Sequence, residues 1–242
     1  MSRPEYGETW AYESIVGALP GVALSERAAF AVQFGLFEAG VLGFAAAYGL
    51  WDAALAGTVA VALSTVGSFE MLRISKLVRR SDPPASYGRA AFGSSIDVVL
   101  GVLAFVALVT YLFVVDPRDG ATLTAELLGA EPPTPAAYLA LLVAWDVCYR
   151  IGTGWWASVV ALWRSVTFRF GPDRRRLLRR ADLETMGFGL LQLSLAPFLT
   201  GHPVLLFAVV GHVVAVAVVT ALSVLALSLR AESDDPATNL SP

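Results

Sequence analysis

Long apolar runs separated by short charged segments dominate the hydropathy pattern of the chain. Each run is close to the roughly 20 residues that an α-helix needs to cross a bilayer. We place transmembrane helices at about residues 28–49, 52–72, 94–115, 136–163, 185–201 and 204–229. The pattern therefore predicts an all-α, polytopic membrane helix bundle with six transmembrane helices.

The positively charged residues between these runs predict the orientation of the bundle. If the N-terminus is cytoplasmic, fifteen Lys and Arg residues flank the cytoplasmic ends of the helices, whereas Arg118 alone lies on the opposite side. Such an excess marks the cytoplasmic side of a membrane protein. We therefore expect N- and C-termini that are both cytoplasmic and a multi-pass protein of the cell membrane.

The segments before and after the apolar runs differ from them in composition. Residues 1–24 form an N-terminal tail whose pattern around Trp10 is compatible with an interfacial helix. Ser25 is a good N-cap residue for the first transmembrane helix, so the membrane domain is expected over residues 25–230. Residues 231–242 are expected to be an acidic, disordered tail.

Ionisable residues inside the apolar runs are the main functional signal. Asp146 and Arg150 are four residues apart, so they share one helix face and can pair. Each charge near the bilayer centre costs about 2.5–3.5 kcal/mol, so neighbouring helices must stabilise the pair. Glu38, Gln192 and His212 lie at similar depth and are expected to face the pair. These five residues are candidates for an ion or proton pathway.

Two functions are open for such a cluster. In the first, the protein is a small proton- or cation-coupled transporter or a channel-like protein, in which Glu38 is the protonatable group. In the second, the protein is a non-catalytic membrane subunit or scaffold, and the pair of Asp146 and Arg150 is structural. A lipid-modifying enzyme is a third and weaker hypothesis, because no motif supports it.

Small residues predict where helices approach closely. Gly35, Ala39 and Gly43 recur at every fourth position of the first apolar run, which is a helix-packing pattern in membranes. Gly152 and Gly154 follow Arg150 and can give close packing or a kink beside the charges. A homo-oligomer or a separate membrane partner is compatible with these surfaces.

Charged residues near the helix ends are expected to contact anionic lipid headgroups. This set consists of Arg73, Lys76, Arg79, Arg80, Arg174, Arg175, Arg176, Arg179 and Arg180. Glu70 and Asp97 are further candidates for the ion or proton pathway. Glu70 is also expected to pair with Arg73 at headgroup level, and Asp97 to be an acid near a helix N-terminus. A nucleic-acid partner is not expected, because no recognition fold accompanies the basic segments.

Composition and missing motifs exclude several functional classes. One Cys cannot form an internal disulfide, and the two His residues are too far apart to indicate a shared metal. Motifs for zinc proteases, serine hydrolases and P-loop ATPases are absent. We therefore expect no cofactor and no metal site, and the sequence favours a non-enzymatic protein over an enzyme without deciding between them. Sixteen Arg against one Lys, with an acidic tail, fits a halophilic or high-GC prokaryote.

Overall fold

The computed structural model describes residues 10, 25–118, 120 and 122–232, which are almost entirely helical and contain no strand. The six long helices are α2 (Glu26–Tyr48), α3 (Trp51–Arg80), α5 (Ile96–Thr110), α7 (Thr134–Thr167), α8 (Pro172–Leu191) and α9 (Pro203–Glu232). The shorter ones are α4 (Ala85–Gly88), η1 (Arg89–Gly93), η2 (Tyr111–Val115), η3 (Asp116–Arg118), α6 (Leu123–Leu128) and η4 (Gln192–Leu199). The all-α prediction is confirmed for these residues.

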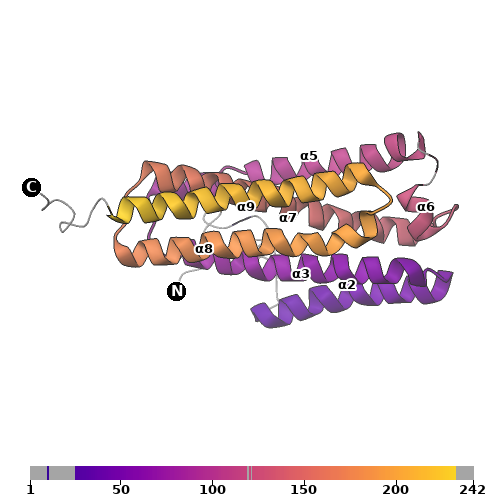
Figure 1. The fold of residues 1–242 in the computed structure, drawn as a ribbon. Coiled ribbons are helices and arrows are strands. Elements are labelled where there is room, and N and C mark those ends of the chain that lie inside the picture. Colours follow the sequence, from indigo (N-terminus) through magenta and orange to yellow (C-terminus); the bar gives the residue numbers. More distant parts are fainter. Residues whose placement is uncertain (1–9, 11–24, 119, 121, 233–242) are drawn as a thin grey trace, which may run out of the picture.

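Local signals at both ends of α2 determine the first hairpin. The Ser25 hydroxyl accepts a hydrogen bond from the Ala28 amide at 3.3 Å, which caps the helix. Gly49 ends α2 at φ 73°, a left-handed conformation that glycine adopts at little steric cost, and its amide donates to the Ala45 carbonyl. Helix α3 begins at Trp51, so the two helices pack side by side in opposite directions (Figure 1).

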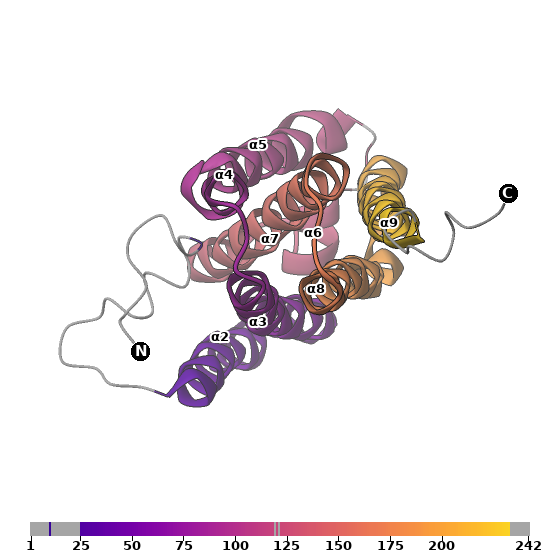
Figure 2. The same ribbon diagram turned by 90° about the vertical axis from the view of Figure 1, so that its left-hand side faces the viewer.

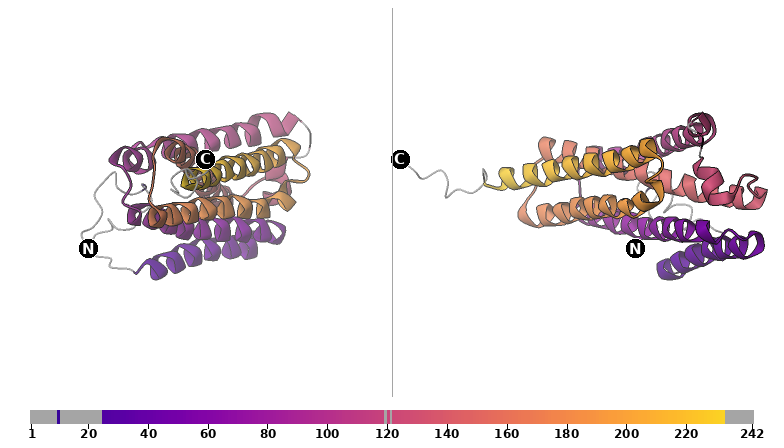
Figure 3. Two further views of the ribbon diagram at one scale, coloured as in Figure 1. Left: turned by 60° about the vertical axis from the view of Figure 1, so that its left-hand side comes forward. Right: turned by 45° about the vertical axis from the view of Figure 1, so that its right-hand side comes forward.

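Helix α7 lies in the middle of the bundle when the molecule is viewed along its long axis (Figure 2). It packs against α5, α9, α3 and α8, whereas α2 lies at the edge and packs mainly on α3. Successive long helices run in opposite directions along the bundle (Figure 3). We call the end where α3 stops and α8 starts the arginine end, and the opposite end, next to α6, the α6 end (Figure 1).

Within the described residues, four helical segments are long and apolar enough to cross a membrane. They are Glu26–Tyr48, Trp51–Arg80, Ala85–Arg118 and Pro203–Arg230. Large apolar side chains are exposed on the outside of the bundle, including Leu36 at 70% and Phe207 at 80%. Contiguous apolar surface of this kind is unusual on a soluble monomer, whereas lipid chains cover it well. The helices are therefore those of a membrane protein.

Helices α3 and α8 are longer than the spans expected from hydropathy. Helix α3 continues past residue 72 to Arg80, and α8 starts at Pro172 instead of near residue 185. Helix α8 also ends at Leu191, and the 3-10 helix η4 forms most of the rest of the expected span 185–201. Both extensions are arginine-rich segments that the hydropathy pattern assigns to loops. Arginine is nevertheless a good helix former, and proline is favoured at the first helical position. The helices therefore continue beyond their apolar parts.

A buried apolar cluster at the arginine end joins α3 to the segment around α4. Met71 and Val78 from α3 belong to it, together with Tyr87 and Phe92. The Trp10 indole N–H donates to the Ala91 carbonyl at 3.0 Å, and its ring meets that of Phe92 edge-on. The rest of the expected N-terminal interfacial helix, and the tail from residue 233 onward, lie outside the described residues.

Candidate functional site

Asp146 and Arg150 form an ion pair along one face of α7. The Nη2 group of Arg150 donates to both carboxylate oxygens of Asp146, at 2.8 and 3.0 Å. Arg150 is 1% exposed, and its Nη1 group contacts the Met71 sulfur at 3.1 Å. The side chain passes over Gly67 of α3, where a methyl group would overlap the Arg150 Cδ. The missing side chain at Gly67 therefore makes room for the guanidinium group.

Glu38 lies in a different place, at the contact between α2 and α3. Its Oε1 accepts a hydrogen bond from the Thr58 hydroxyl at 2.7 Å. Its Oε2 is buried and has no hydrogen-bond partner among the described residues. On the same helix pair, the Ser68 hydroxyl donates to the Gln33 side-chain oxygen at 3.2 Å. Polar side chains thus join α2 to α3 without involving α7.

The other two pathway candidates lie on the α8 and α9 side of the bundle. Gln192 is 2% exposed, and its Oε1 has no hydrogen-bond partner in the described part of the chain. The Nε2 of His212 is likewise buried without a partner. His212 lines an apolar cavity of the bundle, but Glu38, Asp146 and Arg150 do not line it. The five candidates therefore do not line one shared cavity.

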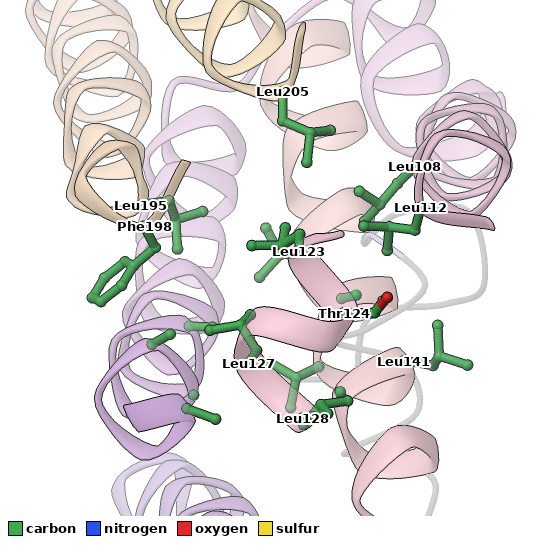
Figure 4. Close-up of a pocket in the computed structure, with 18 of the residues that line it drawn as sticks. Leu108, Leu112, Leu123, Thr124, Leu127, Leu128, Leu141, Leu195, Phe198 and Leu205 are labelled. Carbon is green, nitrogen blue, oxygen red and sulfur yellow. The ribbon is translucent and has the colours of Figure 1, made fainter. Parts of the chain in front are cut away.

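That cavity has a volume of about 680 Å³ and lies toward the α6 end. Its walls are almost entirely apolar, with leucines from η2, α6, α7, η4 and α9 pointing into it (Figure 4). Leu123 and Leu127 of α6 project between Leu108 and Leu195, which come from opposite sides of the bundle (Figure 4). The cavity suits an apolar molecule better than a hydrated ion.

Glycines set the distance between α7 and α5. A methyl group on Gly152 would lie 2.5 Å from the Gly101 amide nitrogen, so only glycine permits this approach. By contrast, Gly35 and Gly43 of α2 and Gly154 of α7 have no neighbouring atom within 4 Å of that position. The small-residue face of α2, which includes Ala39, is exposed. Its expected packing role stays a prediction.

Asp97 and Glu70 form separate polar contacts nearer the arginine end. The Tyr149 hydroxyl donates to the Asp97 carboxylate at 3.1 Å, and Asp97 lies in the first turn of α5. Arg73 donates to Glu70 at 3.2 Å and to Glu184 of α8 at 2.6 Å. Asp97 therefore links α5 to α7, and Arg73, which pairs with Glu70 on its own helix, links α3 to α8 through Glu184.

A buried network at the arginine end was not indicated by the sequence analysis. Arg164 of α7 donates through Nη2 to both oxygens of Asp182 on α8, at 2.7 and 2.6 Å. Asp182 also accepts from Ser223 of α9, and Arg164 donates to the Tyr87 hydroxyl. Arg164 is 0% exposed and Asp182 is 2% exposed. This network joins α7, α8, α9 and α4.

Sequence reasoning missed the network because both charges border segments that hydropathy assigns to loops. Arg164 directly follows the fourth expected span, and Asp182 lies three residues before the start of the fifth. The sequence did contain one signal for it, since the arginine-rich segment can continue the next helix toward its N-terminus. A continuous α8 places Asp182 on the face that turns toward α7 and α9.

A second unpredicted cluster lies at the α6 end. The two ring nitrogens of His202 contact Asp116 at 2.8 Å and Glu126 at 3.2 Å. Asp116 also accepts the Leu123 amide at 2.7 Å. Burial opposes protonation of His202, but the hydrogen bonds to Glu126 and Asp116 outweigh it and raise the His202 pKa above its ordinary value. The cluster connects η3, α6 and the start of α9.

Comparison with known sequences places the chain in a family. Residues 5–223 match a family of unknown function, DUF7530. The chain belongs to the DUF7530 family. No curated protein and no solved structure matches it.

In this DUF7530 member, most of the basic groups expected to contact lipid headgroups form ion pairs with carboxylates of the chain. Lys76 pairs with Glu26 at 2.7 Å and Arg174 with Asp82 at 2.7 Å. Ion pairs also hold Arg73, Arg176 and Arg180. No group of three or more His, Cys, Asp or Glu side chains in the described parts of the chain is arranged to hold a metal. The arrangement can bind an apolar molecule and stabilise buried charge.

Proposed function

We propose that the chain is a six-span protein of the cell membrane with both ends in the cytoplasm. The alternating helix directions support this topology, because each long helix returns the chain to the opposite end of the bundle (Figure 1). Helices α7 and α8 are less apolar than the other four, but their buried charges are paired inside the bundle. A paired and enclosed charge costs much less in a membrane than an exposed one.

Within the membrane, the protein binds the hydrocarbon chain of a lipid in the cavity at the α6 end. The observation that carries this proposal is the size and lining of the cavity, about 680 Å³ with almost no polar surface. This volume lies within the range of about 300–1,000 Å³ that is typical of small-molecule sites. A lipid chain is the preferred occupant, because the cavity is lined by apolar side chains and is partly open.

The buried ion pairs give this protein a scaffold-like, non-catalytic framework. Asp146 and Arg150 lie on one helix, and Arg164 and Asp182 connect two. Each pair satisfies its own charges, so neither leaves a free group beside the cavity to act on a bound molecule. Buried pairs of this kind fix how helices pack, since a misplaced helix leaves a charge unpaired.

Lipid retention measured by native mass spectrometry tests the cavity. The protein is reconstituted with dioleoyl phosphatidylglycerol and extracted into mild detergent, and the bound lipid molecules are counted. Val209→Phe fills the cavity and is expected to remove one retained lipid. Val214→Phe makes the same change on the exposed face of α9, away from the cavity, and is expected to retain it. Equal retention in both variants and the wild type would refute the assignment.

Proton- or cation-coupled transport is a second candidate, supported by Glu38. The buried Oε2 of Glu38 has no hydrogen-bond partner in the described residues, as expected for a carboxyl that exchanges a proton or binds an ion. Flux in reconstituted vesicles tests this role, with Glu38→Gln compared to the wild type. Loss of flux in the variant supports transport, and equal flux removes Glu38 from the pathway.

A further inference from the structure

An arginine-lined pocket of about 400 Å³ lies at the arginine end, between the start of α8 and the end of α9. Four arginines line it: Arg175, Arg176, Arg179 and Arg180. Their spacing of one and four residues places them on one face of α8. Like charges at this spacing repel one another on an isolated helix, so an anion beside them stabilises the arrangement.

The carboxylates of the described chain neutralise only part of this positive charge. Asp173 lies 3.7 Å from Arg176, and Glu184 lies 3.1 Å from Arg180. Arg175 and Arg179 form no ion pair with any residue that the structure describes. Two positive charges in the pocket therefore remain without a counter-charge from the described chain.

Arg175 points most directly to a missing ligand. Its Nη1 group is buried and has no hydrogen-bond partner among the described residues. A buried guanidinium N–H without an acceptor is unfavourable, because the group has lost water and gained nothing in return. Arg175 lines the pocket, so an anion held there is attracted to the positive charge of its guanidinium group. The planar donor arrangement of arginine matches the oxygens of a phosphate group closely.

The remaining walls indicate what is attached to the anion. Leu183 of α8 and Leu227 of α9 line the pocket on the side of α8 that leads into its apolar half. We propose that this pocket binds the phosphate group of a phosphate-bearing molecule, through Arg175 and Arg179, with the apolar part against Leu183 and Leu227. An anionic phospholipid of the leaflet at the arginine end has this chemistry, and a soluble phosphate compound shares its anionic part. The site is separate from the cavity near α6 and does not depend on its occupant.

Binding of dioleoyl phosphatidic acid to the full chain in detergent tests the proposal, with native mass spectrometry as the readout. The wild type is expected to bind one molecule that the Arg175→Gln/Arg179→Gln variant binds at least tenfold more weakly. Arg89→Gln/Arg174→Gln is the matched control, because it removes the same charge from the same end of the bundle but outside the pocket. Its affinity is expected to stay within twofold of the wild type. Arg179→Gln alone, which alters an exposed side chain, is expected to weaken binding as well, and unchanged thermal unfolding of this variant shows that the loss does not come from unfolding.

Calorimetry with inorganic phosphate separates the two sources of the anion. Phosphate binding that depends on Arg175 and Arg179, without lipid binding, supports the site and assigns it to a soluble phosphate compound. Equal losses in the pocket variant and the control would overturn the proposal, because diffuse charge attraction then explains binding. The proposal would also be overturned if the wild type bound neither dioleoyl phosphatidic acid nor inorganic phosphate.

Discussion

Breaking the ion pair between Arg164 and Asp182 is expected to destabilise the bundle more than any change to a surface charge. Asp182→Leu leaves the Arg164 guanidinium group enclosed at 0% exposure without its carboxylate. Removing one partner of a buried pair typically costs about 3–5 kcal/mol. For a chain of this length, that corresponds to a fall in Tm of about 6–20 °C. Arg164→Met is expected to act similarly, because it leaves Asp182 with only the Ser223 hydroxyl.

The double variant Arg164→Met/Asp182→Leu separates pairing from packing. It removes both charges, so it is expected to be more stable than either single variant and within about 2 kcal/mol of the wild type. Unfolding in detergent, followed by the fluorescence of the six tryptophans, provides the measurement. Asp82→Asn is the control, because its pair with Arg174 is exposed and is worth less than about 1 kcal/mol. If Asp182→Leu lowers Tm no more than this control does, the buried network does not stabilise the fold.

Two further predictions concern helix contact and pH. Gly152→Ala is expected to destabilise the bundle by about 1–3 kcal/mol, since its methyl group would press on the α5 backbone. Gly154→Ala is expected to be nearly neutral, because no atom lies near the added methyl group. The Tm values of the two variants in detergent test this difference. Because the pKa of His202 is raised in the folded state, its stabilising effect is complete below its ordinary pKa of 6.5 and is lost as pH rises through the raised value. Tm measured from pH 5 to pH 9 should therefore fall more steeply in the wild type than in His202→Gln; parallel curves would exclude the His202 cluster as the cause.

The sequence alone predicted features that depend on spacing within one helix. Asp146 and Arg150 pair as their four-residue separation indicates, and Arg73 pairs with Glu70 three residues away. Such contacts follow from helix periodicity and need no knowledge of how helices pack. The same reasoning located the apolar helices, because about 20 apolar residues are a signal in themselves.

Contacts between helices could not be read from the sequence in the same way. Arg164 and Asp182 belong to different helices, and the charges around them resemble loop residues until the helix is seen to continue. Arg150 fits only because Gly67 of α3 lies beneath it. No pattern within one helix predicts this contact between two helices. Likewise, depth along the helices suggested that Glu38 faces Asp146, but the position of α2 at the edge of the bundle directs Glu38 to Thr58.

The direction in which α7 crosses the membrane provides the most direct test of the account, because α7 carries two of the buried charges. In a Cys148→Ser background, single cysteines replace Glu131 before α7 and Arg176 after it, both at exposed positions on opposite ends of the bundle. Intact cells are treated with a membrane-impermeant maleimide. We expect Glu131→Cys to be labelled from outside and Arg176→Cys to be labelled only after permeabilisation. Labelling of both positions from the same side would contradict a membrane-spanning α7 and the six-span bundle built around it.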